Sequence, residues 1–215
     1  MDFANGHIYH VFNRGNYSQT LFFSSGDYLL FLSKIEEYIK PHASVLSWCL
    51  MPNHFDLMIR VESERLERFA PPKASGKRPK SSNTPIISNL NYSVASMLRT
   101  YTQAVNSEDH KQGSLFHQPT KALCLSDPRF DVAYFRNHFG NIGNDTLQEK
   151  DYPFVCFQYM HQIPVKGKLV ENPEDWEFSS YHDYFSERKG TLVNRQLAKE
   201  LGLLSKAGIE NLNTH

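Results

Sequence analysis

Apolar and aromatic residues recur along the first part of the chain at spacings that predict a strand followed by a helix. The stretch HIYHVFNRG (7–15) is dense enough in such residues to form a strand. In the next stretch apolar residues return every three or four positions, which predicts an amphipathic helix with Ser24 or Ser25 as its N-cap. Pro41 is expected to end this helix.

A hairpin and a second helix follow. ASVLSWCLM (43–51) and HFDLMIRV (54–61) are typical of two strands joined by the turn-forming Pro52-Asn53. Residues 62–84 lack periodicity and are rich in Pro, Ser and Lys, which predicts a flexible basic insertion. Residues 87–106 are expected to form a helix.

The rest of the chain adds one strand and several helical stretches. TKALCLS (120–126) is expected to form a short strand, and the chain is predicted to be mainly helical from Pro128 to Pro164. The resulting β-α-β-β-α-β order is typical of an α+β, ferredoxin-like antiparallel sheet with helices packed on one face. We expect one domain over residues 1–185 and a helical tail over 186–215.

Composition is that of an ordinary globular protein, and charge adds one detail. The 215 residues carry 23 basic and 23 acidic side chains, so zero net charge argues against a generic nucleic-acid binder. Between Arg68 and Ser107, however, there are six basic residues and no acid, which favours a basic surface able to meet phosphates. The three cysteines form no CxxC pair, and no signal peptide or membrane span is seen. We expect a soluble, cytoplasmic protein with no membrane partner.

The most informative residues lie at the start of the strand over 54–61. Because alternate residues of a strand share a face, His54 and Asp56 point to the same side, away from the apolar face of Phe55 and Leu57. An imidazole and a carboxylate so placed can bind Mg²⁺, Mn²⁺ or a similar divalent ion. The alternative is polar surface on a half-exposed strand.

Four collinear stretches over about residues 7 to 184 resemble the single-tyrosine HUH transposases, specifically the insertion-sequence and REP-associated tyrosine transposase group. YHVFNRGNYSQTLFF is similar to the family's first strand and turn, and LSWCLMPNHFDLMIRV to the strand with its MPNHFHLL metal motif. GSLFHQPTKALCL resembles the family's GSLF-Q-x-x-FK segment. QYMHQIPVKGKLVENPEDWEFSSYHDY resembles its YIHxNPVxxGLVxxPEDWxWSSYxxY block.

The resemblance implies a metal-dependent enzyme that nicks and rejoins single-stranded DNA at hairpin-forming ends during transposition, through a 5′-phosphotyrosine intermediate. It places the nucleophile at Tyr159 and the first metal ligand at His54. The usual second histidine is Asp56 here, a residue that can still bind Mg²⁺ or Mn²⁺. The usual Asn after the tyrosine is Ile163, so Gln162, three residues after Tyr159, is the candidate third ligand.

Other assignments stay open at the level of the sequence. Tyr134 with His138 forms a rival pair of nucleophile and ligand. Arg14 and Lys121 at strand ends, and Lys77 and Arg78 in the basic insertion, are candidate contacts to DNA phosphates. The alternative function is a catalytically degenerate or domesticated protein that binds DNA hairpins without cutting them. A homodimer is possible, because relatives include both dimers and monomers.

Overall fold

The computed structural model describes residues 2–63, 65–68, 86–108, 113–126 and 152–204. Within them, four strands form an antiparallel sheet in the order β2-β3-β1-β6, and two more form a separate antiparallel pair, β4-β5. The strands are β1 (Ile8–Arg14), β2 (Ala43–Met51), β3 (His54–Val61), β4 (Arg65–Arg68), β5 (Ile86–Asn89) and β6 (Lys121–Cys124). This order and the helices between the strands confirm the predicted α+β, ferredoxin-like class.

The register of the sheet brings two chain segments together at one end. β2 and β3 form the predicted hairpin, with Met51 opposite His54 across the Pro52-Asn53 turn. β1 runs antiparallel to β3 along its length, from Ile8 opposite Arg60 to Arg14 opposite His54. Arg14 and His54 therefore meet at the same end of the sheet.

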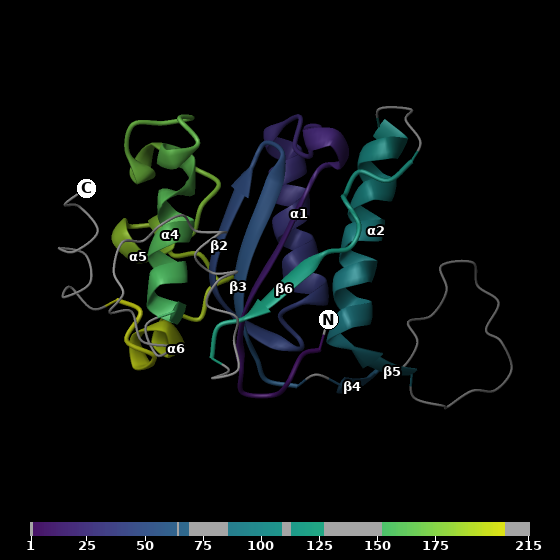
Figure 1. The fold of residues 1–215 in the computed structure, drawn as a ribbon, viewed down its shortest axis with the longest axis horizontal. Helices are drawn as coiled ribbons and strands as arrows, with labels where there is room; N and C mark the ends of the chain where they lie inside the picture. Colours follow the sequence, from purple (N-terminus) through teal and green to yellow (C-terminus); the bar gives the residue numbers. More distant parts are fainter. Residues whose placement is uncertain (1, 64, 69–85, 109–112, 127–151, 205–215) are drawn as a thin grey trace, which may run out of the picture.

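Two long helices cover one face of the sheet. α1 (Ser25–Tyr38) and α2 (Leu90–Glu108) contact each other beside it (Figure 1). The core beneath them is strongly aromatic, and Phe31, Phe55 and Tyr101 are each fully buried. The apolar side of α2 lies in this core through Val94, Met97, Leu98, Tyr101 and Val105.

The opposite face of the sheet is covered too, which differs from the helices-on-one-face arrangement expected from the sequence. α4 (Tyr152–Lys166) packs on β2 and β3, and α5 (Tyr181–Phe185) and α6 (Arg195–Glu200) flank it (Figure 1). A second apolar cluster fills this layer, with Met58 from β3 and Cys156, Phe157 and Met160 from α4. The face that carries Asp56 is thus buried where the sequence predicts an open one, because α4 has an apolar side that must also be covered.

The start of α1 carries a complete capping box. Ser24 accepts the Asp27 amide, and the buried Asp27 carboxylate accepts the amides of Ser24 and Phe23, each at 2.8 Å. Replacing Asp27 by Ala leaves two amides without their acceptor, so we expect a loss of about 1–2 kcal/mol in unfolding free energy. Urea unfolding followed by circular dichroism measures it.

The control is Glu37→Ala. Glu37 makes an exposed ion pair with Lys34 at 2.8 Å, which contributes about 0.5 kcal/mol or less. Equal losses in both variants would contradict a structural role for the capping box.

Two elements differ from the sequence-based expectation around the basic insertion. Arg65–Arg68 forms β4, paired with β5, where an irregular segment is predicted. The following helix begins at Leu90 rather than at residue 87, because the Asn89 side chain accepts the Tyr92 amide at 2.8 Å and caps it. Residues 69–85, the greater part of the predicted insertion, lie outside the described residues.

The chain after α4 runs along the outer edge of β2. The Leu50 amide donates to the Phe178 carbonyl and the Ser180 amide to the Trp48 carbonyl. The Ser180 hydroxyl in turn accepts the Trp48 amide. Further on, the Asn194 amide donates to the Val45 carbonyl. Two aromatic contacts add to this: the Trp176 indole donates to the Leu50 carbonyl, and the Phe178 ring stacks on Tyr28 with centroids 3.9 Å apart.

One buried histidine makes the stability of this layer sensitive to acid. The His161 ring on α4 lies 2.8 Å from the Ser180 hydroxyl, and burial lowers the pKa of His161 from 6.5 to about 3. Below about pH 6.5 the unfolded chain takes up a proton that the folded chain does not. We therefore expect stability to fall as the pH is lowered from 6.5 towards 3, by up to about 1.4 kcal/mol per pH unit.

The measurement is urea unfolding at a series of pH values for His161→Gln and the wild type. The variant is expected to show the shallower decline over this range. The same substitution at His182, a partly exposed histidine on α5, serves as control. Identical slopes for wild type and His161→Gln would show that another group governs the acid sensitivity.

Candidate functional site

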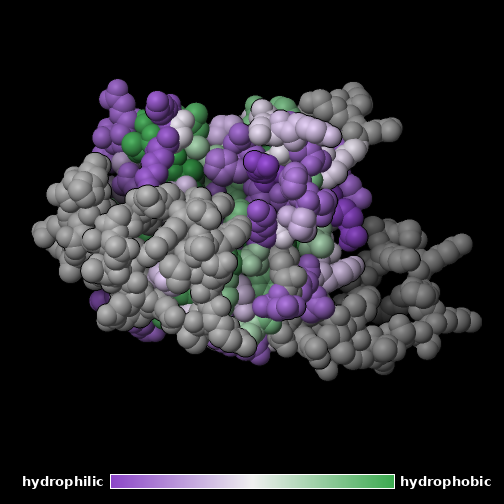
Figure 2. Space-filling model, in the orientation of Figure 1, coloured by the Kyte–Doolittle hydropathy of each residue, from purple (hydrophilic) through white to green (hydrophobic). Residues whose placement is uncertain are grey.

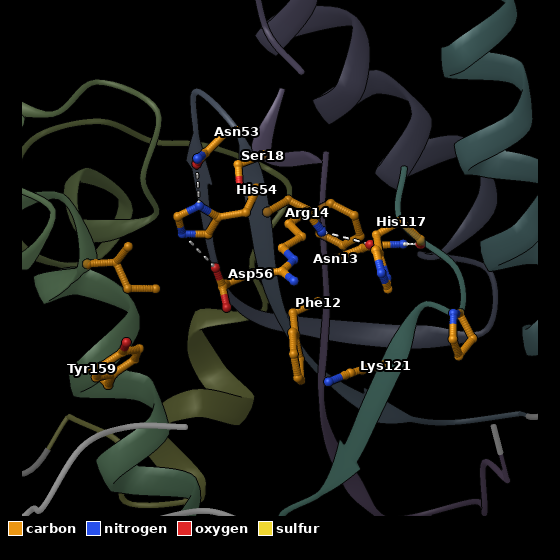
Figure 3. A pocket seen from close by; sticks show the side chains of 13 residues that line it. Phe12, Asn13, Arg14, Ser18, Asn53, His54, Asp56, His117, Lys121 and Tyr159 are labelled. Carbon is orange, nitrogen blue, oxygen red and sulfur yellow. Dashed lines mark hydrogen bonds and ion pairs between the residues drawn. The ribbon is translucent and has the colours of Figure 1, made fainter. Parts of the chain in front are cut away.

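A cavity of about 460 Å³ opens between β1, β3, β6 and α4. Four residues that the sequence singles out for chemistry or DNA contact line it together: His54, Asp56, Arg14 and Lys121. Tyr159 on α4 faces them across the cavity (Figure 3). The remaining lining residues are Phe12, Asn13, Ser18, Asn53, Phe55, His117, Pro119 and Ile163.

His54 is held in one orientation by its neighbour in the hairpin turn. Its Nδ1 lies 2.7 Å from the side-chain carbonyl oxygen of Asn53, which can only accept, so Nδ1 carries the proton (Figure 3). In the neutral ring Nε2 is then the nitrogen without a proton, and it lies 3.6 Å from Oδ2 of Asp56. Two acceptor atoms thus face one another, an arrangement that a cation between them stabilises.

Asp56 is almost completely buried and is positioned by a histidine on the adjacent strand. Its Oδ1 accepts a hydrogen bond of 2.7 Å from Nε2 of His10, a fully buried residue of β1. The His10 ring stacks on Phe12, with centroids 4.5 Å apart. The hydrogen bond from His10 fixes Oδ1 of Asp56 and leaves Oδ2 on the side of His54.

Tyr159 brings a hydroxyl to the cavity from α4. Burial, and then the negative charge of Asp56, raise the pKa of Tyr159 above its ordinary value. The phenol is therefore protonated at neutral pH. Lys166, two turns along the helix, places its ammonium 4.5 Å from the centre of the Tyr159 ring. This cation is close enough to favour negative charge that develops on the tyrosine side of the cavity.

Two exposed basic side chains line the opposite side. Arg14 comes from the end of β1 and Lys121 from the start of β6 (Figure 3). Gly15 lets the chain turn directly after Arg14, since a Cβ there would lie 2.1 Å from the Gln19 carbonyl oxygen. The cavity thus has a carboxylate and imidazole on its floor and cations at its edge, a distribution suited to a phosphodiester.

The structure divides the sequence-based candidates into three groups. Tyr159, His54, Asp56, Arg14 and Lys121 meet in the cavity. Gln162, the candidate third ligand, is not among the lining residues, and its neighbour Ile163 takes that place. Candidates in the third group lie outside the described residues: Lys77, Arg78, Tyr134 and His138.

Two residues that orient the metal-capable side chains were missed from the sequence. His10 lies in the first predicted strand on the same face as Phe12 and Arg14, so the two-residue period would have placed it next to the metal motif once β1 and β3 were paired. Asn53 was interpreted only as a turn residue, although its side chain also orients His54. Both roles depend on contacts between neighbouring residues that a turn or strand pattern alone does not specify.

Searches with the sequence found no matching family model and no matching curated protein. A comparison of structures did find a match. The chain superposes on a REP-associated tyrosine transposase bound to a REP hairpin with a TM-score of 0.50, covering 91% of this chain and 95% of that one at 12% identity. Among the described residues, no helix is both long and apolar enough to cross a membrane. On the basis of this superposition, the chain has the fold of a REP-associated tyrosine transposase, the group that its four sequence stretches also resemble.

Proposed function

We propose that this protein nicks and rejoins single-stranded DNA at hairpin-forming ends, with Tyr159 as nucleophile. The observation that carries the proposal is the convergence of Tyr159, His54, Asp56, Arg14 and Lys121 on one cavity, from four elements far apart in the sequence. Hairpin DNA as partner is supported by the structural neighbour, which is bound to a REP hairpin.

The reaction uses the tyrosine hydroxyl as a covalent catalyst. The Tyr159 oxygen bonds to the scissile phosphorus, the bond from phosphorus to the 3′ oxygen breaks, and the DNA is left with a 3′ hydroxyl and a 5′-phosphotyrosine. Attack of a 3′ hydroxyl on the phosphotyrosine reverses the chemistry and rejoins strands. Since the phenol is protonated at rest, its proton has to leave during attack, and the leaving 3′ oxygen has to take one up. The imidazole and carboxylate groups that line the cavity are those of His54, Asp56 and His117, and of these His117 is the one not assigned to the cation.

Arg14 and Lys121 are assigned to the phosphates on either side of the scissile bond. Both are exposed cations at the cavity edge, so they can bind the backbone without reading its sequence. Lys166 beside the Tyr159 ring supports the phosphate after transfer to the tyrosine.

The residues present fit a divalent cation bound by two protein ligands. His54 Nε2 and Asp56 Oδ2 are 3.6 Å apart, while the described residues contain no group of three His, Cys, Asp or Glu side chains that could hold a metal. Mg²⁺ often has few protein ligands and completes its shell with water and phosphate oxygens. His54 and Asp56 would hold Mg²⁺ or Mn²⁺, which when bound polarises the scissile phosphate.

A covalent-trapping assay tests the proposal. Labelled single-stranded oligonucleotides containing the palindromes that flank the gene are incubated with protein and Mg²⁺, Mn²⁺ or EDTA, then run on a denaturing gel. We expect a shifted band with either metal, no band with EDTA, and no band with the fully duplex oligonucleotide. Absence of any adduct under all conditions would refute the nuclease activity.

The second candidate function is hairpin binding without chemistry. It is favoured by one observation, namely that Ile163, which cannot coordinate a metal, lines the cavity on the tyrosine helix. A native gel of the same mixtures separates the two functions: bound hairpin without a covalent adduct would identify a binding protein. The double variant Asp56→His with Ile163→Asn would then test whether restoring the family pattern restores nicking.

A further inference from the structure

Two histidines line the cavity in the part of the chain that the structure describes, and the proposed function gives a role to His54 alone. The second, His117, lies in the segment between α2 and β6. It is exposed, and neither of its ring nitrogens makes a hydrogen bond to a described residue. In GSLFHQPTK it follows GSLF directly, where the family pattern GSLF-Q-x-x-FK has Gln. Its role therefore has to be argued from this chain.

The backbone of His117 is held against β1 on both sides. Its amide donates to the Arg14 carbonyl at 2.8 Å, and its carbonyl accepts the side-chain amide of Asn13 at 2.9 Å. Asn13 is buried and also donates to the Thr120 hydroxyl at 2.8 Å. The preceding residue, Phe116, is buried in the aromatic core. The His117 ring is thus presented from a fixed position, which favours a role in chemistry.

His117 lies across the cavity from the nucleophile. Figure 3 shows Tyr159 on one side and His117 on the other, with Asp56 and Arg14 between them. In an in-line displacement the attacking and leaving oxygens lie on opposite sides of the phosphorus. A phosphate that receives the Tyr159 oxygen therefore turns its leaving 3′ oxygen towards the side of His117. In Figure 2, hydrophilic residues gather between α4 and α2 over the upper part of the sheet, as expected where a phosphodiester enters.

The other proton-carrying groups of the cavity already have partners. Nδ1 of His54 lies against the Asn53 side-chain oxygen, and its Nε2 is assigned to the cation. Oδ1 of Asp56 accepts from His10, and its Oδ2 is assigned to the cation. An arginine side chain does not release its proton, whereas an imidazole exchanges one near neutral pH. Lys121, which also lines the cavity, is the remaining rival, and the experiment below includes it.

We infer that His117 is the general acid of the cleavage step and gives its proton to the leaving 3′ oxygen. The Tyr159 oxygen bonds to phosphorus, and the bond from phosphorus to the 3′ oxygen breaks with its electron pair on that oxygen. The partly exposed phenol loses its proton to water, and the imidazolium of His117 protonates the 3′ oxygen. In rejoining, the neutral imidazole takes the proton of the attacking 3′ hydroxyl. The inference rests on the proposed function, because it takes nicking by Tyr159 as given.

The test is the covalent-trapping assay with two oligonucleotides that differ in one atom. At the nick site, mapped first from the wild-type products, one has the ordinary 3′ oxygen and the other has sulfur in its place. Both give the same 5′-phosphotyrosine. Sulfur leaves as a thiolate that needs no proton, because thiols are much stronger acids than alcohols. Initial rates in Mn²⁺ are compared for wild type, His117→Ala and His117→Gln, so that rejoining does not contribute.

On the ordinary oligonucleotide we expect His117→Ala to form adduct about 10²–10³-fold more slowly than wild type, as is usual when a positioned general acid is lost. On the sulfur oligonucleotide its rate should lie within about threefold of wild type. His117→Gln should behave as the Ala variant, since a carboxamide does not release a proton. Hairpin affinity in a native gel should be unchanged, and thermal unfolding checks the fold.

Two further variants serve as controls. His182→Ala removes a partly exposed histidine of α5 that does not line the cavity, so it should behave as wild type on both oligonucleotides. Asp56→Ala should be slow on both, because polarisation of the phosphate is needed whichever atom leaves.

The inference is overturned if His117→Ala is equally slow on both oligonucleotides, which would show a positioning role, or if it is as fast as wild type on the ordinary one. Rescue by sulfur in Lys121→Gln but not in His117→Ala would transfer the role of acid to Lys121. If wild type forms no adduct with either oligonucleotide, the proposed function itself fails, and the inference fails with it. That outcome is distinct, because all the others require adduct formation by wild type.

Discussion

Tyr159→Phe is expected to eliminate the covalent protein–DNA adduct, with at least about a 10⁴-fold drop in its rate of formation, because the substitution removes the attacking oxygen and little else. The ring, its helix and the Lys166 contact all remain. Hairpin affinity in a native gel should therefore stay within about twofold of wild type. The measurement is the denaturing gel described above, with time points long enough to detect residual adduct.

Two further tyrosine variants make this result specific. Tyr38→Phe, on α1 and outside the cavity, should form adduct as wild type does. Tyr134→Phe tests the rival nucleophile. An adduct that survives Tyr159→Phe and is lost in Tyr134→Phe would transfer the chemical role to Tyr134 and overturn the proposed assignment.

The second large effect is expected for Asp56→Ala, which removes the carboxylate shared by the cavity and His10. We expect adduct formation to fall by about 10²–10³-fold, since a bound divalent ion contributes several kcal/mol of charge stabilisation at a phosphate. Mn²⁺ affinity, measured by electron paramagnetic resonance without DNA, should fall at least about tenfold. Asp56→Asn keeps the shape and an acceptor for His10 while removing the charge, so it should share both defects.

His10→Ala separates the orienting contact from the ligand itself. Because Asp56 keeps its charge but loses the hydrogen bond of 2.7 Å, we expect a smaller loss, about 10–100-fold in Mn²⁺ affinity or adduct formation. Unchanged Mn²⁺ affinity in Asp56→Ala would show that Asp56 is not a metal ligand. A thermal unfolding curve accompanies each variant, since both groups are buried.

Much of the sheet could be predicted from the sequence because its strands carry their own signals. The hairpin is predictable from the apolar runs of β2 and β3 and the Pro52-Asn53 turn between them. The alternation along β3 also predicts that His54 and Asp56 share a face, and in the structure both line one cavity. The start of α1 was predictable to within one residue, with Ser24 or Ser25 as its cap, because a cap is a local interaction; in the structure the cap is Ser24.

Features that depend on distant partners were not predictable in this way. β4 and β5 are four residues each and are stabilised by each other, so neither carries a pattern long enough to predict a strand. The covering of Asp56 by α4 follows from packing between segments about a hundred residues apart. His10 became visible as a partner of Asp56 only when the pairing of β1 with β3 was known.

The segments that run along β2 have a consequence for shortened forms of this protein. The outer edge of β2 forms hydrogen bonds with residues 178–180 and 194. Three apolar side chains of the following segment are also buried: Val193, Ala198 and Leu203. A strand edge stripped of such cover offers a template for pairing with other chains. A fragment cut at residue 185, the boundary expected from the sequence, would uncover part of this edge and is expected to aggregate. A minimal folded fragment has to extend through residue 203.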